Sequence, residues 1–269
     1  RLRRFADVDV VVRQADVAGA EAVLVELGYR PGGVEEILAV PPKLPAERQY
    51  AHALTRRFQT RWLAAYSWYP PSGGALLPVD LHWHVAPARL HVPEAALWAE
   101  TTATRLGATQ LLTFTPAATL IHLAVHATTA LYSGFRLMHL CDVGWAARLL
   151  AEHEAPMWRL ADAWRVRPHV TLVFDTVERA LGIELPFANA PHATRRLPPQ
   201  RIVDAATAPA FLIEAPSHKK RPLRQRLGPE LIWSVAMGSL RRNLIIIGAV
   251  AWARARFRWF RWRRTRAAA

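Results

Sequence analysis

The stretch RRFADVDVVV, residues 3–12, decides the fold, because it has the composition of a β-strand and carries two acidic residues. Side chains along a strand alternate between its two faces. Asp7 and Asp9 therefore share one face, and Val8 and Val10 are expected to point into the packing. Two adjacent carboxylates repel each other unless water or a cation compensates, and hard divalent cations such as Mg²⁺ bind carboxylate oxygens. The strand is therefore a candidate metal site.

The residues after this strand predict a helix, a turn and further strands. Residues 14–27 have apolar positions at helical spacing and are followed by Gly28, a residue that is common just after a helix. Residues 31–48 contain four prolines and two glycines, which predicts a loop. The mixture of aromatic and polar residues in 50–69 favours strands of a meander over a long helix.

A second strand with an acidic residue is predicted in ALLPVDLHWH, which ends at His84. Alternation of side chains puts Asp80, His82 and His84 on one face of this strand. Leu81 and Trp83 lie on the opposite, apolar face. The polar face thus offers one carboxylate and two imidazoles.

The two predicted strands together supply three carboxylates. If the strands are neighbours in one sheet, Asp7, Asp9 and Asp80 form a cluster of the kind that holds two metal ions for phosphoryl or nucleotidyl transfer. The alternative is that Asp-x-Asp, a short pattern that arises often by chance at strand edges, binds no metal. In that alternative the two histidines pack beside Trp83.

The chain after residue 92 is expected to be helical, because apolar residues recur at helical spacing and proline stands near several of the predicted starts. His122 and His126 lie four residues apart on one predicted helix, and we interpret them as core or groove histidines because no third ligand is recognisable. Residues 186–216 are rich in proline and alanine and predict a linker or an irregular wrap. The predicted helices span 93–103, 116–132, 135–150, 157–164 and 168–181.

The positive charge of the chain is concentrated at its C-terminal end. The formal net charge is +14, but residues 217–269 hold 14 basic residues and one acidic residue, whereas residues 1–216 hold 21 basic and 20 acidic residues. The segment RARFRWFRWRRTR, which begins at Arg254, interleaves arginine with aromatic residues. This composition suits an anionic partner, either a membrane surface or a nucleic acid, through residues 241–266. The alternative is a fraying, disordered basic tail.

Cysteine content and hydropathy favour a cytoplasmic location, with attachment at the inner face of the membrane through the basic segment. Cys141 is a single cysteine, which excludes an internal disulfide. The first residues lack the long apolar run of a secretory signal. The apolar run 244–253 has about half the length that a membrane-spanning helix needs.

Three segments resemble, in order and in spacing, the uncharacterised nucleotidyltransferase family of bacteria, a branch of the DNA polymerase β-like nucleotidyltransferase superfamily. The family pattern is an arginine, a strand Asp-Ile-Asp-Leu-Leu-Val, a helix that ends in Leu-x-x-x-Gly-Tyr, the motif Val-Asp-Leu-His-Trp, and a helical region with Leu-x-x-His and Leu-x-Asp-Ile. The resemblance covers residues 1–186. The matching positions are Arg4, residues 7–12, residues 24–29, residues 79–83 and residues 120–142.

The resemblance implies an α+β fold, with a nucleotidyltransferase-like mixed β-sheet and flanking helices in the N-terminal half and an all-helical C-terminal half. Within the region of the resemblance we expect a catalytic core over residues 1–92 and a helical subdomain over 93–186. Beyond it, composition predicts a linker or wrap over 187–230 and a basic aromatic tail over 231–269. Members of the superfamily carry a Gly-Ser, Gly-Gly or Lys-Gly turn shortly before the Asp-x-Asp strand. Six residues precede Asp7 here, so we expect this turn to lie upstream of the sequence or to have been lost.

The resemblance also implies a reaction and roles for particular residues. Asp7 and Asp9 would coordinate two Mg²⁺ ions that clamp the triphosphate of a nucleoside triphosphate, and Asp80 would bind one ion and orient the acceptor hydroxyl. Contacts with phosphate or substrate are expected from Arg4, His82 and His84. A nucleoside monophosphate would pass to an unidentified acceptor with release of pyrophosphate. The rival interpretation is a non-catalytic binding protein with this fold, attached to an anionic partner by its basic tail.

Overall fold

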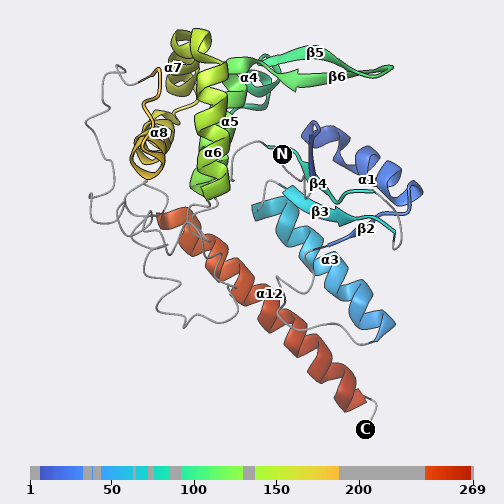
Figure 1. Ribbon diagram of the computed structural model, residues 1–269. Helices are drawn as coiled ribbons and strands as arrows, with labels where there is room; N and C mark the ends of the chain where they lie inside the picture. The colour runs from blue at the N-terminus through green and yellow to red at the C-terminus, as the bar shows by residue number, and fades with distance from the viewer. Residues whose placement is uncertain are drawn as a thin grey trace. The chain divides into compact units, whose positions relative to one another are not determined.

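The computed structural model describes residues 7–32, 38, 44–62, 65–71, 76–84, 92–129, 137–187 and 240–267. The chain divides into two compact units (Figure 1). Unit 1 combines residues 1–88 with residues 242–269, and unit 2 consists of residues 89–241. The acidic strands and the basic C-terminal segment, far apart in the sequence, therefore belong to the same unit.

A four-stranded mixed sheet forms the centre of unit 1. Its order is β1 (Val8–Val11), β4 (Val79–His82), β3 (Ala65–Tyr69) and β2 (Arg30–Pro31). β1 runs parallel to β4, whereas β3 is antiparallel to both β4 and β2. The two strands with acidic residues are thus neighbours, and the predicted mixed sheet in the N-terminal half is confirmed.

One face of this sheet is apolar and packs against the helix that follows β1. A short 3-10 turn, η1 (Gln14–Asp16), leads into α1 (Val17–Glu26), which ends before Gly28 as the sequence predicts. Gly28 has a φ of +81°, a conformation that glycine adopts without a Cβ penalty, and the chain turns there into β2. The cluster between α1 and the sheet contains Leu24, Tyr29, Tyr66, Trp68, Leu81 and Trp83.

Val8 and Val10 are less buried than the prediction that they point into the packing implies. They lie in register with Val79 and Leu81 and so share the apolar face, but they remain 44% and 38% exposed. β1 is the terminal strand in the order of the described sheet, and the buried cluster is centred on the inner strands. Alternation predicted the face correctly, but the position of the strand within the sheet set the burial.

The predicted meander over residues 50–69 is wrong for its first part. Residues 50–62 belong to the helix α3 (Pro45–Trp62), and only β3 is a strand. Proline at the first position and Glu47 in the first turn are favourable at a helix start. Ala51 and Leu54 are buried against another helix. This packing stabilises the helical conformation of residues 50–62, and the local composition gave no indication of it. Arg56 of α3 also forms an ion pair with Glu21 of α1.

That other helix is α12 (Leu240–Ala267), a 28-residue helix formed by the basic C-terminal segment (Figure 1). Ala253 and Phe257 of α12 are buried beside α3 residues. Phe260 stacks on Tyr50 with ring centroids 4.1 Å apart, and Arg261 pairs with the buried Glu47 at 3.4 Å. The alternative of a fraying, disordered tail is therefore wrong for residues 240–267.

Unit 2 is built mainly from helices, as predicted. Four predicted helices are confirmed, with ends that differ by a few residues from the predicted ones. The fully buried side chains of these helices include Leu120, Ile121, Leu140, Met157 and Leu172. α8 packs against each of the other three helices. These helices are α5 (Pro116–Thr129), α6 (Leu137–Leu149), α7 (Glu154–Ala163), which follows the turn η3 (Ala151–His153), and α8 (Arg167–Leu181).

The prediction of an all-helical C-terminal half is wrong at the start of unit 2. A helix was expected over 93–103, but α4 (Glu94–Trp98) is only five residues long. The antiparallel hairpin β5 (Thr101–Leu106) and β6 (Thr109–Phe114) follows it. Threonine-rich runs on either side of Gly107 carry the hairpin signal, because β-branched residues favour strands and glycine favours a tight turn.

Two further expectations concern the C-terminal part of the chain. The predicted linker over 187–230 lies almost entirely outside the described residues. Within the part of the chain that the structure describes, none of the helices combines the length and the apolar character needed to span a membrane.

Candidate active site

The register of β1 and β4 brings two carboxylates together. Asp9 lies opposite Asp80, one step along from the pairing of Val8 with Val79. Paired residues of neighbouring strands project from the same face, so both carboxylates lie on the face opposite to the Leu81 cluster. His82, two residues after Asp80, projects from this polar face as well.

The three polar side chains converge to within the reach of a single ion. His82 Nε2 lies 2.9 Å from Asp9 Oδ1, a hydrogen-bond distance. Each of Asp9, Asp80 and His82 offers one ligand atom, and all three atoms lie within 4.8 Å of one another. The side chain of Asp9 is 44% exposed and that of His82 is 21% exposed. The group is therefore open to solvent and to a ligand from outside.

The donor set suits a divalent cation. Two ligand atoms of one ion are separated by at most twice the metal–ligand distance, which is roughly 4 Å for Mg²⁺ and up to about 5 Å for Ca²⁺. The three atoms lie within 4.8 Å of one another, inside the limit for a larger hard cation such as Ca²⁺, whereas the limit for Mg²⁺ is tighter. Carboxylate oxygens are the protein ligands that Mg²⁺ takes, whereas imidazole is a more common ligand of Mn²⁺ and Zn²⁺. Asp9 and Asp80 thus fit a hard cation, and His82 fits best as the hydrogen-bond partner that orients Asp9.

The structure does not group all the sequence-predicted site residues. Asp7 precedes β1 and shares the face of Asp9 by alternation, but within the described residues it is not part of the group that closes to 4.8 Å. His84 follows β4 and is likewise outside this group. Arg4 lies outside the described residues. The three-carboxylate cluster and the roles of Arg4 and His84 therefore stay predictions.

The contact between His82 and Asp9 is one that the sequence did not predict. The sequence placed His82 beside Asp80 on one strand and assigned it to substrate, whereas in the structure it bonds to a carboxylate of the neighbouring strand. The pairing depends on the parallel register, in which His82 lies opposite Val11, two residues along from Asp9. The sequence showed that His82 shares a strand face with Asp80, because polar and apolar residues alternate in PVDLHWH. Alternation does not show which residue of a neighbouring strand lies opposite His82.

Comparison with known proteins bears directly on this site. The sequence profile described as an uncharacterised nucleotidyltransferase matches residues 1–182. The chain belongs to the uncharacterised nucleotidyltransferase family. The match includes β1 and β4 with all three grouped side chains, and it continues to the C-terminal end of α8. No match was found among curated proteins or among solved structures.

Membership of the nucleotidyltransferase family supports a function in nucleotidyl transfer. It also gives the carboxylates a chemical context, because enzymes of phosphoryl and nucleotidyl transfer use carboxylate-bound cations. The grouped residues and the family therefore point to the same kind of chemistry. The match extends through the helices of unit 2, so the family region is larger than the sheet that carries the acids.

A second cluster of titratable side chains lies in unit 2. His126 on α5 is close to His122 of the same helix and to His139 of α6, with ring centroids 5.9 Å and 5.2 Å apart. Among the described residues, these histidines do not form a group whose ligand atoms all lie within 4.8 Å. His122 is partly buried and His126 is exposed, and the interpretation of the pair as core or groove histidines stays a prediction.

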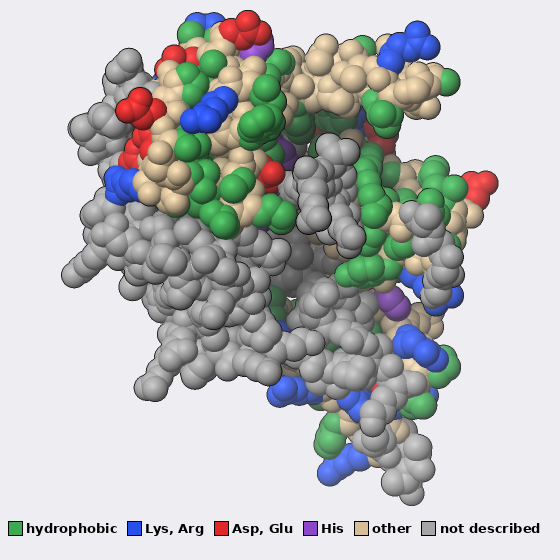
Figure 2. All heavy atoms as spheres, viewed as in Figure 1, with side chains coloured by type: hydrophobic (Ala, Val, Ile, Leu, Met, Phe, Trp, Pro, Cys, Tyr) green, Lys and Arg blue, Asp and Glu red, His purple; other side chains and the backbone are tan. Residues whose placement is uncertain are grey.

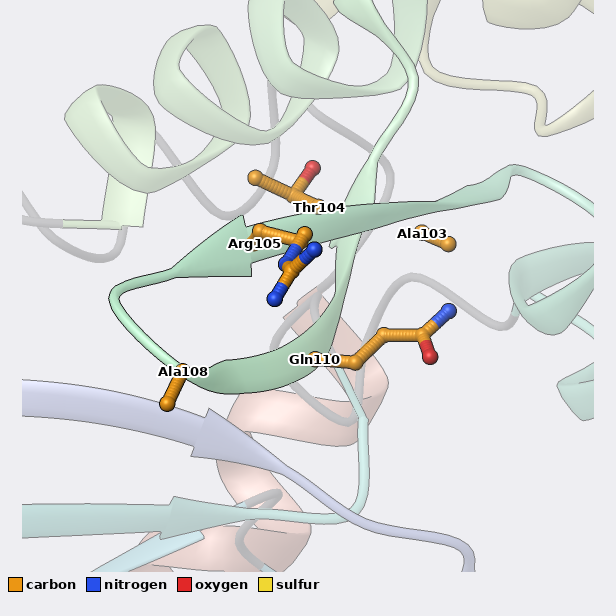
Figure 3. A pocket seen from close by; sticks show the side chains of 5 residues that line it. All are labelled: Ala103, Thr104, Arg105, Ala108 and Gln110. Atoms are coloured by element: carbon orange, nitrogen blue, oxygen red, sulfur yellow. The ribbon is translucent and has the colours of Figure 1, made fainter.

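The β5–β6 hairpin of unit 2 carries a shallow pocket of about 280 Å³ (Figure 3). Arg105 and Gln110 lie opposite each other in the hairpin register. The lining contains one charged side chain, that of Arg105, and it has no carboxylate or imidazole with which to bind a cation. This pocket therefore lacks the groups for nucleotidyl transfer. Its lining residues are Ala103, Thr104, Arg105, Ala108 and Gln110.

Proposed function

We propose that this member of the family is a Mg²⁺-dependent nucleotidyltransferase that transfers a nucleoside monophosphate from a nucleoside triphosphate to a hydroxyl or phosphate acceptor. The observation that supports this proposal is the convergence of Asp9, Asp80 and His82 on the polar face of the sheet. The reaction forms a bond between the acceptor oxygen and the α-phosphorus and breaks the bond to pyrophosphate. The acceptor and the preferred base stay open in this proposal.

We assign a role to each residue on the basis of its position. Asp9 and Asp80 would hold the cation through their oxygens, and a bound Mg²⁺ would supply positive charge to neutralise the triphosphate. His82, when its Nε2 carries the proton, donates to Asp9 Oδ1 and fixes the direction in which that carboxylate presents its other oxygen. A second ion would draw on Asp7, which is on the same strand face, and on oxygens of the substrate.

The acceptor hydroxyl needs a group that orients it and receives its proton. Asp80 lies on the inner of the two acid-bearing strands, beside the exposed Asp9, and we assign it this role. His84 and Arg4 are proposed to contact phosphate, as expected from the sequence. Catalysis in this scheme comes mainly from positioning and from electrostatic stabilisation of the transferred group.

A second candidate function is attachment to an anionic partner through residues 241–266, in the cytoplasm and at the inner face of the membrane. It is favoured by α12, which carries nine arginines and no acidic residue. Attachment would use α12 and not the acidic group, so one protein can have both functions. If the protein has no catalytic activity, attachment alone is the function of the non-catalytic binding protein described above.

The first experiment is isothermal titration calorimetry of the chain with each of the four nucleoside triphosphates in Mg²⁺. The test variants are Asp9→Asn and Asp80→Asn, and the matched control is Asp16→Asn, since Asp16 is exposed and makes no capping hydrogen bond. Each variant removes one negative charge, so a general charge effect would appear in all three. We expect the two test variants to lose nucleotide-dependent heat and the control to keep it.

The same proteins are assayed for pyrophosphate release with the nucleotide that binds. Nucleotide binding that all three variants retain would contradict the role of the acidic group. Absence of binding in a parent chain that is extended upstream to include the expected turn would contradict the enzyme and would leave the binding protein. Circular dichroism of each variant verifies that the fold is intact.

A further inference from the structure

The outward face of α12 combines arginine with tryptophan in a regular pattern. Trp252, Arg256, Trp259 and Arg263 follow one another at spacings of four, three and four residues, which places them on one side of a helix. The guanidinium carbon of Arg256 lies 5.5 Å and 5.8 Å from the ring centroids of Trp252 and Trp259. Arg263 lies 4.9 Å from the ring of Trp259. The four side chains thus form a continuous ladder of cation–π contacts.

A fifth and a sixth side chain widen this face. Arg266 lies 4.4 Å from the ring centroid of Trp262, which is three residues after Trp259. We call these six residues the Trp–Arg face of α12. In Figure 2, basic and hydrophobic side chains lie close together near the C-terminal end of α12. The members of the Trp–Arg face are Trp252, Arg256, Trp259, Trp262, Arg263 and Arg266.

Among the described residues of unit 1, the side of α12 that is buried is not the one that carries the Trp–Arg face. The opposite side of α12 contacts α3 through Ala253 and Phe257, which are buried. The three tryptophans on the outward side are 52%, 47% and 50% exposed. A large aromatic side chain that remains half in water, on a helix already fixed by another contact, adds nothing to the core. An exposed apolar patch interleaved with polar groups marks an interaction surface.

We propose that the Trp–Arg face binds an anionic membrane surface, with α12 lying parallel to it. The tryptophan rings would enter the headgroup region, where this side chain is enriched in membrane proteins, and the guanidiniums would contact lipid phosphates. This inference commits the second candidate function to one partner and one helix face. It does not depend on nucleotidyl transfer, because none of the six residues belongs to the acidic group.

The geometry favours a membrane over a nucleic acid. Proteins that bind single-stranded nucleic acids place aromatic side chains along a groove that follows the backbone, whereas the Trp–Arg face lies on the outward side of a single helix. At 1.5 Å per residue the Trp–Arg face, from Trp252 to Arg266, is about 21 Å long, so its charges extend over a surface and not around one phosphate. Because the buried side of α12 is held by α3, the contact would be peripheral, without insertion of the backbone.

Flotation with lipid vesicles tests the proposal on the full chain. The vesicles contain phosphatidylcholine alone or phosphatidylcholine with phosphatidylglycerol. The variants are Trp259→Ala with Trp262→Ala, and Arg256→Gln with Arg263→Gln. The matched control is Trp145→Ala with Arg148→Gln, which removes an exposed tryptophan and an exposed arginine from α6 of unit 2. All of these side chains are at the surface, so the fold is expected to survive, and thermal unfolding verifies it.

We expect the parent chain and the control to float with the anionic vesicles and to stay unbound with neutral ones. Each double variant should lower the vesicle affinity by roughly tenfold or more, since each arginine near an anionic surface and each interfacial aromatic contributes to binding. Absence of binding to anionic vesicles would overturn the proposal. Equal loss in the control would overturn the assignment to α12, and loss in the arginine variant alone would overturn the role of the tryptophans.

A single-stranded oligonucleotide is titrated into the same proteins. If the chain binds the oligonucleotide tightly and does not bind anionic vesicles, the partner of the Trp–Arg face is a nucleic acid, and the inference is overturned. The Asp9→Asn variant is included in the flotation assay and should bind vesicles like the parent. If vesicle binding fails while nucleotide binding persists, the Trp–Arg face is contradicted and the proposed transferase is not.

Discussion

Asp162 and Arg167 form a two-point ion pair between the end of α7 and the start of α8. Arg167 Nε and Nη2 lie 2.5 Å from the two carboxylate oxygens of Asp162, and the guanidinium also lies 4.7 Å from the ring centroid of Trp158. The hydrogen bond from Arg167 lowers the pKa of Asp162 below its ordinary value of 3.8. The arrangement is geometrically specific, because both oxygens and both nitrogens are engaged.

Replacement of Asp162 by asparagine should destabilise unit 2 in a pH-dependent way. A carboxyl whose pKa is lower in the folded state stabilises the fold above the pKa of the unfolded chain, and this contribution disappears as the pH falls through the folded pKa. Because the side chain of Asp162 is 58% exposed, solvent screening limits the loss at neutral pH to about 0.5–1 kcal/mol. Urea unfolding of the parent and Asp162→Asn chains at neutral and acidic pH measures it. A difference that is as large at a pH well below 3.8 as at neutral pH would contradict the linkage.

In the candidate active site, the sequence predicts which residues take part, and the structure shows which of them lie together. Asp9, Asp80 and His82 are all residues that the sequence singled out. Alternation along a strand predicts which face each side chain takes, but it gives no partner on another strand. The parallel register brings His82 to Asp9, and Asp7 lies outside the described group. The residue types were predictable, and their grouping was not.

At the scale of elements, the β5–β6 hairpin turns through Gly107 and Ala108. Leu106 pairs with Thr109, so the loop has two residues, and Gly107 has a φ of +61°. A glycine with positive φ at the first loop position matches the type II′ turn of tight hairpins. An added Cβ at Gly107 would meet nothing within 4 Å, so the only cost of a side chain there is backbone strain.

Alanine substitutions at two glycines should therefore have opposite effects. Gly107→Ala is expected to destabilise the hairpin by about 1–2 kcal/mol, because an alanine is strained at positive φ. Gly19→Ala is the matched control, since Gly19 lies in α1, has open space around it and lacks a positive φ. It should stabilise unit 1 by roughly 0.5–1 kcal/mol through the lower entropy of the unfolded chain. Hydrogen exchange of β5–β6 and of α1 amides measures both, and a loss of similar size at both sites would refute the backbone explanation.

The contact between α3 and α12 depends on one aromatic side chain in particular. Phe257 is 1% exposed and lies in a cluster with Leu38, Ala51 and Leu54. Truncation of a buried phenylalanine removes its transfer free energy and leaves a cavity.

Phe257→Ala is expected to destabilise unit 1 by about 3–5 kcal/mol. Trp252→Ala, a substitution of comparable size on the exposed side of the same helix, should change stability by less than about 0.5 kcal/mol. Hydrogen exchange of the α3 amides distinguishes the two, because only the first variant should make them exchange faster. Equal behaviour of the two variants would mean that the apolar side of α12 does not stabilise α3.

The elements that sequence reasoning missed have a common cause. Residues 50–62 contain aromatic and polar residues that locally suit strands, but packing of Ala51 and Leu54 against α12 selects the helix. The partner helix is about 200 residues away in the sequence, beyond the reach of any local pattern. The helices of unit 2 were predictable because each pattern is long and continuous, whereas α4 and the hairpin are short.

At the scale of the whole molecule, unit 1 is assembled from the two ends of the described chain. Residues 1–88 and 242–269 form it, and residues 89–241 form unit 2 between them. Unit 2 buries its own core, with Leu120, Leu140 and Leu172 each about 1% exposed or less. The helix that carries the positive charge is therefore part of the same unit as the acidic group.

A chain that ends at residue 239 tests this organisation. Without α12, the residues of α3 that contact it would face water, so unit 1 should lose stability and the α3 amides should exchange faster. The amides of α5, α6 and α8 should stay protected, since their core lies within unit 2. Hydrogen exchange with mass spectrometry gives both readings. Parallel loss of protection in α5 and α8 would show that the two units do not fold separately.

The sequence by itself determined the nucleotidyltransferase family, the mixed α+β character, the helices of unit 2 and the residue types of the candidate site. These follow from order, spacing and alternation, which are local properties of the chain. Tertiary structure decided that α3 is a helix, that the basic segment packs on it, and that His82 joins Asp9. Each of these contacts joins residues more than 70 positions apart or depends on strand register, and such pairings are set by packing between elements that no local pattern encodes.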